Sequence, residues 1–370
     1  MSSRLMGVIN LIQEPDELES LTSGRCLATV PFGARYRLID FTLSSMVNSG
    51  ISKVAVFAHT KYRSLMDHLG SGRHWDLHHR QSGLFILPPA AEDISDMRKG
   101  DLYHFYQHRD YFNRSQQEYV VVTRSHMICN IDLSQVLQDH IERGADITVV
   151  CKKQTDRLNG KAVNVKVGKD GRIVQMQDHY GRLSSDIVSM EMYFMKKELL
   201  LDLVETSLAQ GQDHFVRHAI MPRLDRLKIN AYMYEGYLGI INTVASYYRN
   251  SMQLLTPKVW RNLFFEPGPV YTKVKDEPPA CYLDGSTTSN SLIANGCLIE
   301  GTVINSILFR GVKVRKGAVV RNSIIMQNGE IGIGSAIDHV ILDKEVCIEA
   351  GRDIRGVTDS PFIAVKRKVI

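Results

Sequence analysis

A basic segment near the N-terminus has the residue types best suited to chemistry on an anionic ligand. It reads GRCLATVPFGARYRLIDF over residues 24–41, between a strand-like stretch at residues 5–11 and a helical pattern after Tyr36. Basic side chains offset the charge of phosphates and other small anions. The net charge of +5 is mild, with basic and acidic residues interspersed. This pattern favours a small anionic ligand and argues against nucleic acid as the partner.

Length and cysteine usage indicate a cytosolic protein of two domains. A chain of 370 residues exceeds one typical hydrophobic core. The six cysteines lie far apart, without a C-x-x-C pair or zinc-finger spacing, so we expect reduced thiols. No apolar run approaches the ~18–20 residues that span a bilayer, so we expect no membrane segment and a cytoplasmic location.

The first 256 residues predict a Rossmann-like α/β domain. Short β-branched runs at 51–58, 118–123 and 146–151 are apolar enough for strands buried on both faces. A helical pattern separates the last two, with Ser134 expected to cap its start and Gly144 its end. Alternation of this kind predicts a largely parallel sheet with helices on both faces.

The chain changes character after residue 256. Residues 257–280 contain five prolines and are expected to form a stiff linker. In residues 281–370 an aliphatic residue recurs about every six positions, with small or polar residues behind it. Such a repeat predicts a parallel β-helix, because each short strand buries its face only by stacking. An antiparallel sandwich is disfavoured, since regularly spaced N-G or D-G hairpin turns are missing.

Two long motifs carry a family resemblance over almost the whole chain. PFGARYRLIDFTLSSMVNSGI near the start and EGYLGIINTVASYYRNSMQLL before the linker resemble the bacterial glucose-1-phosphate adenylyltransferases, or ADP-glucose pyrophosphorylases. The resemblance implies a nucleotidyltransferase domain over 1–256 and a left-handed β-helix over 281–370. It also implies a place in glycogen synthesis, where the adenylyl group of ATP is transferred to glucose 1-phosphate with release of diphosphate and with Mg²⁺ held by carboxylates.

The chain departs from this family at its phosphate loop. The family pattern G-G-x-G-x-R-L provides backbone donors and an arginine for the phosphates. Without gaps, the matching residues here are Ile12, Gln13, Glu14, Pro15, Asp16, Glu17 and Leu18. Proline has no N–H, and the carboxylates would repel a triphosphate. The loop is therefore not expected to bind phosphates.

Other positions that carry catalytic or metal-binding residues in the family also carry side chains here that lack the required charge or ligand atoms. Leu27 stands at the position of a lysine beside the reacting phosphates, and His126 and Ile240 stand at the two metal-binding aspartates. Imidazole is a poor ligand for Mg²⁺ and isoleucine is none. The segments at 100–104 and 178–179 also lack the family's substrate-binding residues. His126 has a second interpretation, as a core histidine with satisfied polar groups.

We therefore expect a regulatory subunit of the GlgD type with little or no activity of its own. No catalytic, cofactor-binding or metal-binding residue is expected in this chain, and Mg²⁺ would be used by a catalytic partner subunit. A heterotetramer with that partner is expected, with homo-oligomers of the chain alone as a further form. The alternative is an active sugar-phosphate nucleotidyltransferase with a remodelled site. A hexapeptide acyltransferase is disfavoured, because His339 is the only histidine in the repeats.

The resemblance also implies an effector site between the domains. Arg25 and Arg37 match basic residues that bind an anionic effector in the family, so a sugar phosphate or phosphate is expected to bind there. A structural interpretation of Arg37, in which it pairs with Asp40 at the start of a helix, remains open.

Overall fold

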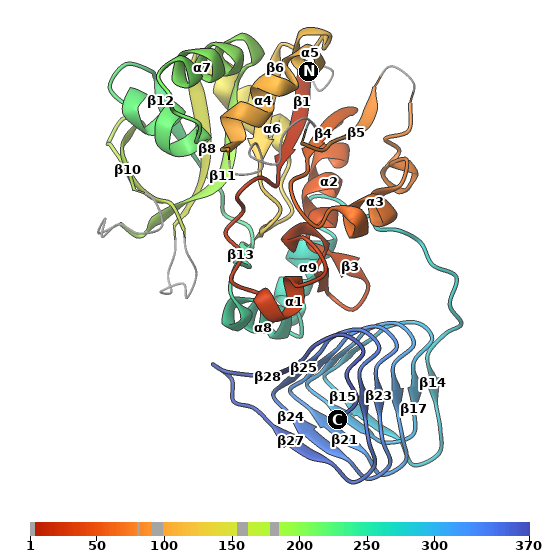
Figure 1. Ribbon diagram of the computed structural model, residues 1–370. Coiled ribbons are helices and arrows are strands. Elements are labelled where there is room, and N and C mark those ends of the chain that lie inside the picture. The colour runs from red at the N-terminus through yellow and green to blue at the C-terminus, as the bar shows by residue number, and fades with distance from the viewer. Residues whose placement is uncertain (1–3, 80–81, 90–98, 154–161, 178–184) are drawn as a thin grey trace.

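The α/β domain is built on one nine-stranded sheet (Figure 1). The computed structural model describes residues 4–79, 82–89, 99–153, 162–177 and 185–370. The main path of the sheet runs through β10 (Ile173–Gln177), β9 (Asn164–Val167), β11 (Ile187–Lys196), β6 (Tyr119–Thr123), β1 (Leu5–Asn10), β4 (Lys53–Phe57) and β5 (Gly83–Leu87). Two further strands, β8 (Ile147–Lys153) and β12 (Ile229–Met233), extend it from β11.

The sheet is mixed rather than largely parallel. The three runs predicted as strands correspond to β4, β6 and β8, and β6, β1, β4 and β5 are parallel to one another as expected. However, β11 runs antiparallel to β6, β8 and β9. Among the described residues no helix lies between β8 and β11, and strands joined without a crossover helix pair in antiparallel fashion.

Helices cover both faces of this sheet. Side chains of α4, α5 and α7 pack with Met6 and Val120 on one face, and those of α2, α3 and α6 pack with Ile9 and Val54 on the other. The α-helices of the described residues are α1 (Glu19–Thr22), α2 (Leu38–Asn48), α3 (Arg63–Leu69), α4 (Asp101–Gln107), α5 (Arg109–Asn113), α6 (Leu133–Glu142), α7 (Lys197–Ala209), α8 (Val244–Gln253) and α9 (Pro257–Phe264). None of the described helices is long and apolar enough to cross a membrane.

The cap of α6 differs from the sequence prediction. Asp132, rather than Ser134, is the N-cap residue, and its carboxylate accepts the backbone N–H of Ser134 at 2.9 Å. The hydroxyl of Ser134 donates to the same carboxylate oxygen at 2.6 Å. Aspartate and serine are both good N-cap residues, so residue type alone did not distinguish Asp132 from Ser134. Gly144 follows the helix with a φ of +53°, as a glycine after a helix end commonly does.

The C-terminal residues form a left-handed parallel β-helix of three five-stranded sheets. One sheet consists of β14 (Cys281–Tyr282), β17 (Leu298–Ile299), β20 (Lys313–Val314), β23 (Glu330–Ile331) and β26 (Cys347–Ile348). The second consists of β15 (Thr287–Ser289), β18 (Thr302–Ile304), β21 (Val319–Arg321), β24 (Ala336–Asp338) and β27 (Asp353–Arg355). The third consists of β16 (Leu292–Ile293), β19 (Ile307–Leu308), β22 (Ile324–Ile325), β25 (Val340–Leu342) and β28 (Phe362–Ala364).

The start of the expected linker is folded. Residues 257–264 form α9, whose Leu263 and Phe264 are buried. Proline is compatible with the first turn of a helix, so Pro257 did not prevent one here. In Figure 1, α1 and α8 lie against the β-helix. Side chains of both domains, among them Tyr247 and Ile324, share one hydrophobic cluster, so the domains form a packed junction.

Candidate functional site

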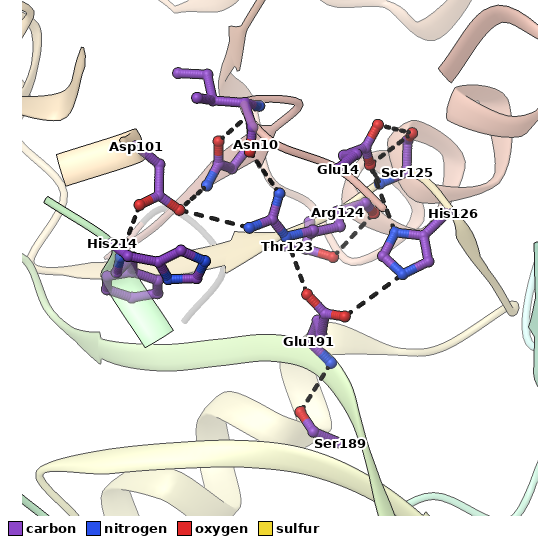
Figure 2. A network of polar contacts seen from close by, with 12 residues as sticks. Asn10, Glu14, Asp101, Thr123, Arg124, Ser125, His126, Ser189, Glu191 and His214 are labelled. Carbon is purple, nitrogen blue, oxygen red and sulfur yellow. Dashed lines mark hydrogen bonds and ion pairs between the residues drawn. The ribbon is translucent and has the colours of Figure 1, made fainter. Parts of the chain in front are cut away.

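Five buried charged side chains occupy the region where the family would bind phosphates and metal. They form a chain of alternating sign (Figure 2), in the order Asp101, Arg124, Glu191, His126 and Glu14. The ion-pair distances along the chain are 3.5, 2.9, 3.4 and 3.7 Å. All five side chains are nearly inaccessible to solvent. Buried charges persist when they are paired, so each member depends on its neighbours.

This network fixes the loop that corresponds to the phosphate loop. The carboxylate of Glu14 accepts the backbone N–H of Ser125 at 2.6 Å and its hydroxyl at 2.9 Å. Arg124 donates to the backbone oxygen of Ile12 at 2.7 Å. Glu14 and Ile12, which stand at loop positions of the family, are thus bound to the segment that follows β6. The Ser125 N–H, the Ser125 hydroxyl and the Arg124 guanidinium thus all donate within the protein.

Asp101 closes the other end of the chain of charges. Its carboxylate accepts the side-chain amide of Asn10 at 2.8 Å and the backbone N–H of Phe215 at 2.7 Å. Asn10 in turn accepts the backbone N–H of Ile12 at 3.1 Å. Asp101 lies within the segment where the family has a substrate-binding motif, and here that segment serves internal contacts.

Glu191 reaches the network because of a backbone irregularity. Its φ is +50°, and the pairing of β11 with β8 shifts register between Ser189 and Tyr193. A positive φ is uncommon for a residue other than glycine, and a bulge redirects a side chain. The Ser189 hydroxyl accepts the Glu191 N–H at 3.0 Å and supports this conformation. Local strain is thus maintained where the Glu191 carboxylate meets Arg124 and His126.

The surroundings keep both cations charged. Burial lowers the pKa of His126, but the neighbouring carboxylates of Glu14 and Glu191 outweigh that effect and raise it to about 9. For Arg124 burial also acts against the charge, and Glu191 and Asp101 more than offset it, so its pKa is raised. Three carboxylates and two cations leave a net charge of −1.

This arrangement does not fit Mg²⁺. His126 is an imidazole between two carboxylates, and imidazole is a poor ligand for Mg²⁺. Ile240 in β13 (Gly239–Ile240) is buried and packs with Met127 and Val188. The N–H of Ile241 donates to the backbone oxygen of His126 at 3.0 Å, so the structure does bring the two aspartate-equivalent positions side by side. In the described part of the chain no group of three or more His, Cys, Asp or Glu side chains could hold a metal ion.

A small cavity lies beside this loop. Leu27 lies in the 3-10 helix η2 (Leu27–Thr29) and is buried in the junction cluster, so its side chain supplies no charge at the position of the family's lysine. The cavity measures about 150 Å³, and its lining includes Glu14, Asp16 and Leu27 together with the cationic Arg25 and Lys61. Ligand pockets usually measure about 300–1,000 Å³, so this cavity is too small for ATP. The segment 178–179 lies outside the described residues.

A second cavity, at the junction of the two domains, is strongly basic. It measures about 220 Å³ and Asp67 is the only carboxylate among its lining residues. Its six cationic residues are Arg35, Arg37, Lys273, Lys275, Arg310 and Lys344. Burial, together with the charges of Arg37 and Arg25, lowers the pKa of Lys344 to about 7. Like charges crowded in this way favour an anion that neutralises them.

The two arginines predicted to bind an effector lie in different surroundings. Arg37 lines the basic cavity and donates to the backbone oxygen of Ser64 at 2.9 Å. Asp40 accepts the backbone N–H of Arg37 at 2.9 Å, which completes the start of α2 without a guanidinium–carboxylate pair. Arg25 lies outside that cavity's lining and donates to both carboxylate oxygens of Asp343 in the β-helix, at 2.8 and 2.6 Å.

Sequence reasoning missed most of the basic cavity. Lys273 and Lys275 come from the linker, and Lys344 follows Asp343 in the β-helix. Arg310 follows β19 in the β-helix. Their shared signal was positive charge, which is common on protein surfaces. Only the packing of the domains brings these side chains to one cavity.

Comparison with known proteins agrees with the fold and the sequence motifs. The nucleotidyl transferase family matches residues 16–252, and the GlmU-like C-terminal hexapeptide family matches residues 279–359. The glucose-1-phosphate adenylyltransferase of Bacillus cereus (strain Q1) is 32% identical over 343 residues, which cover 91% of each chain. The chain belongs to this adenylyltransferase family.

Two other members of the family are more similar to this chain. The glycogen biosynthesis protein GlgD of Bacillus subtilis (strain 168) is 39% identical over 365 residues, or 99% of this chain and 96% of the relative. The GlgD protein of Geobacillus stearothermophilus is 45% identical over 345 residues, or 86% of this chain and 84% of the relative. The family predicted from the sequence motifs is confirmed.

Proposed function

We propose that this chain is a catalytically silent or near-silent regulatory subunit of a glucose-1-phosphate adenylyltransferase that acts in glycogen biosynthesis. The buried chain of charges carries the proposal. His126 pairs with Glu14 where the family has a metal-binding aspartate, and Pro15 has no N–H to offer a triphosphate. The names of the GlgD relatives support the role in glycogen synthesis.

The proposed partner is a catalytic subunit of the same family, with which the chain forms a heterotetramer in the cytoplasm. That partner would hold Mg²⁺ and both substrates. The packed junction between the domains gives a physical route for regulation, because the buried Arg25–Asp343 pair connects the basic segment with the β-helix. A change at this junction could alter the surface that the partner contacts.

The proposed effector is a small anion, a phosphate or a sugar phosphate, in the basic cavity. Arg37 would contact it directly, together with Arg310 and Lys344. Arg25 would act through Asp343, whose neighbour Lys344 lines the cavity. A bound anion would draw these cations together and stabilise the junction.

An assay of the chain alone, the catalytic partner alone and the two mixed tests the proposed function. The chain alone should form no measurable ADP-glucose with Mg²⁺, and the mixture should exceed the partner alone. Leu27→Lys by itself should stay inactive, because the phosphate loop and both metal positions are still replaced. Robust turnover by the pure chain would favour the active nucleotidyltransferase with a remodelled site.

Inorganic phosphate is expected to bind the basic cavity and raise the melting temperature of the chain. Arg310→Ala or Lys344→Ala should weaken binding roughly tenfold or more, because each removes a charge-assisted contact. Lys316→Ala is the matched control, since Lys316 is exposed on the β-helix and outside the cavity. Calorimetric titration at constant ionic strength measures the affinity. Equal affinities for all four proteins would contradict binding in this cavity.

A further inference from the structure

Lys344 is held at the wall of the basic cavity by its backbone. It lies in the turn that follows β25, and its side chain lines the cavity. Its N–H donates to the carboxylate of Asp343 at 2.7 Å, and its backbone oxygen accepts the N–H of Arg367 at 3.0 Å. Both contacts lie within the β-helix, so the stacked coils fix the point from which this side chain enters the cavity.

The carboxylates on either side of Lys344 in the sequence are paired with other cations. Asp343 accepts from the guanidinium of Arg25, and Glu345 accepts from that of Arg367 at 2.6 Å. Within the described residues no carboxylate forms an ion pair with the Nζ of Lys344. The amine therefore lacks a close counter-charge that would favour its protonated form.

The surroundings of Lys344 favour a neutral amine. Arg25 and Arg37 of the basic segment and Lys275 of the linker face it, and Asp343 opposes them. The other titratable residues that line the cavity are Arg35, Tyr36, Asp67, His68, Lys273 and Arg310. With its pKa lowered from 10.5 to about 7, most of the Lys344 amine is neutral at about pH 8, where an ordinary lysine is almost wholly protonated. A neutral amine is a nucleophile.

Arg310 supplies a binding group for phosphate in the same cavity. Its side chain is only 8% exposed and lines the cavity, and in the described part of the chain its guanidinium donates no hydrogen bond to the protein. A buried guanidinium of this kind is satisfied by an anion. Because the cavity measures only about 220 Å³, an atom one bond beyond a phosphate on Arg310 and Arg37 lies close to the Lys344 amine.

We propose that Lys344 is an acylation site for an acyl phosphate bound in the basic cavity. This inference rests on the anion-binding part of the proposed function. The Nζ attacks the carbonyl carbon, the bond from that carbon to the phosphate oxygen breaks, and phosphate leaves with the bonding electron pair. One proton passes from the nitrogen to solvent, and a neutral amide remains.

The cavity favours an acyl phosphate over other acyl donors. The cations that bind its phosphate also stabilise that phosphate as the leaving group, so a donor without phosphate gains nothing from them. The resulting amide carries no charge, so acylation removes one of the six cations of the cavity. The acylated chain should therefore bind anions more weakly at the domain junction.

Acetyl phosphate is the probe for this reaction. The purified chain is incubated with it at about pH 8, and peptide mass spectrometry measures the rate of acetylation at each lysine. Lys344 should react roughly tenfold or more faster than Lys316, which is exposed on the β-helix and outside the cavity. Inorganic phosphate should slow the reaction at Lys344 alone, and Arg310→Ala should remove most of its advantage. The rate at Lys344 should also level off at a lower pH than the rate at Lys316.

Acetic anhydride is the control donor, because it transfers the same acetyl group without a phosphate. With it the advantage of Lys344 over Lys316 should shrink. Lys344→Arg keeps the positive charge and has no amine to acylate, so it serves as the matched variant. After treatment with acetyl phosphate, calorimetry should show a loss of phosphate affinity of roughly tenfold in the wild type and little loss in Lys344→Arg.

Three outcomes would overturn the proposal. These are equal rates at Lys344 and Lys316 with acetyl phosphate, a rate at Lys344 that inorganic phosphate does not slow, and an equal loss of affinity in Lys344→Arg. The rates are measured on the wild-type chain, so they do not depend on whether a variant folds. Phosphate that binds in calorimetry while Lys344 stays unreactive would refute acylation alone, and ADP-glucose synthesis tests the silent-subunit proposal separately.

Discussion

Replacing Arg124 by methionine is expected to lower the free energy of unfolding of the α/β domain by about 3–5 kcal/mol. Methionine fills much of the same volume but removes the cation that Glu191 and Asp101 share, at 2.9 and 3.5 Å. Both carboxylates would then be buried without a compensating charge, and the backbone oxygen of Ile12 would lose its donor. Urea unfolding followed by the fluorescence of Trp75, which is buried in this domain, measures the change.

Arg143→Met is the matched control for this prediction. Arg143 pairs with Asp139 at 2.8 Å on α6, where nearly half of its side chain is exposed. Its loss should cost less than about 1 kcal/mol, because solvent screens such a pair. Adding Glu191→Gln to Arg124→Met should restore part of the stability, since one unpaired charge is removed. If Arg124→Met and Arg143→Met are equally stable, the buried network does not hold this region together.

The contribution of His126 to stability is expected to disappear as the pH is raised. The pKa of His126 is raised from 6.5 to about 9 by the carboxylates of Glu14 and Glu191, so the folded state holds this proton more tightly than the unfolded chain. The stabilisation is therefore fully present below pH 6.5 and is lost as the pH rises through about 9. The difference between the two pKa values corresponds to about 3 kcal/mol.

The contribution of Lys344 to folding stability has the opposite pH dependence. The effect of His126 must therefore be measured as the difference in stability between the wild type and a His126 variant. The pKa of Lys344 is lowered from 10.5 to about 7, which makes its contribution more favourable to the folded state as the pH rises above 7. Subtracting the stability of His126→Gln from that of the wild type cancels the effect of Lys344. The difference should fall between pH 6.5 and 9.5 in urea titrations. A difference that stays constant over this range would show that His126 is not charged in the folded chain.

Several features of the fold could be predicted because they depend on local pattern. The hexapeptide period identified the β-helix, since stacking repeats require the same residue type at the same place in every coil. The apolar runs located β4, β6 and β8. Local pattern failed at α9, where a proline-rich segment begins with a helix, and at β11, whose direction depends on its neighbours rather than on its own residues.

What the sequence by itself determined about the site is which side chains stand at the working positions of the family. Leu27, His126 and Ile240 lack the charge or the ligand atoms that their positions require, and this follows from residue identity without coordinates. The same applies to Pro15, which has no N–H for a phosphate.

The tertiary structure alone decided which partners these side chains contact. Glu14, His126 and Glu191 lie far apart in the sequence, and they meet because a bulge in β11 directs the Glu191 carboxylate toward the loop after β1. Likewise, the docking of the β-helix determines that Arg25 pairs with Asp343 while Arg37 lines the basic cavity. The physical reason is that ion pairs form through space. Their partners depend on strand register and domain packing, neither of which is encoded in the spacing of the charged residues.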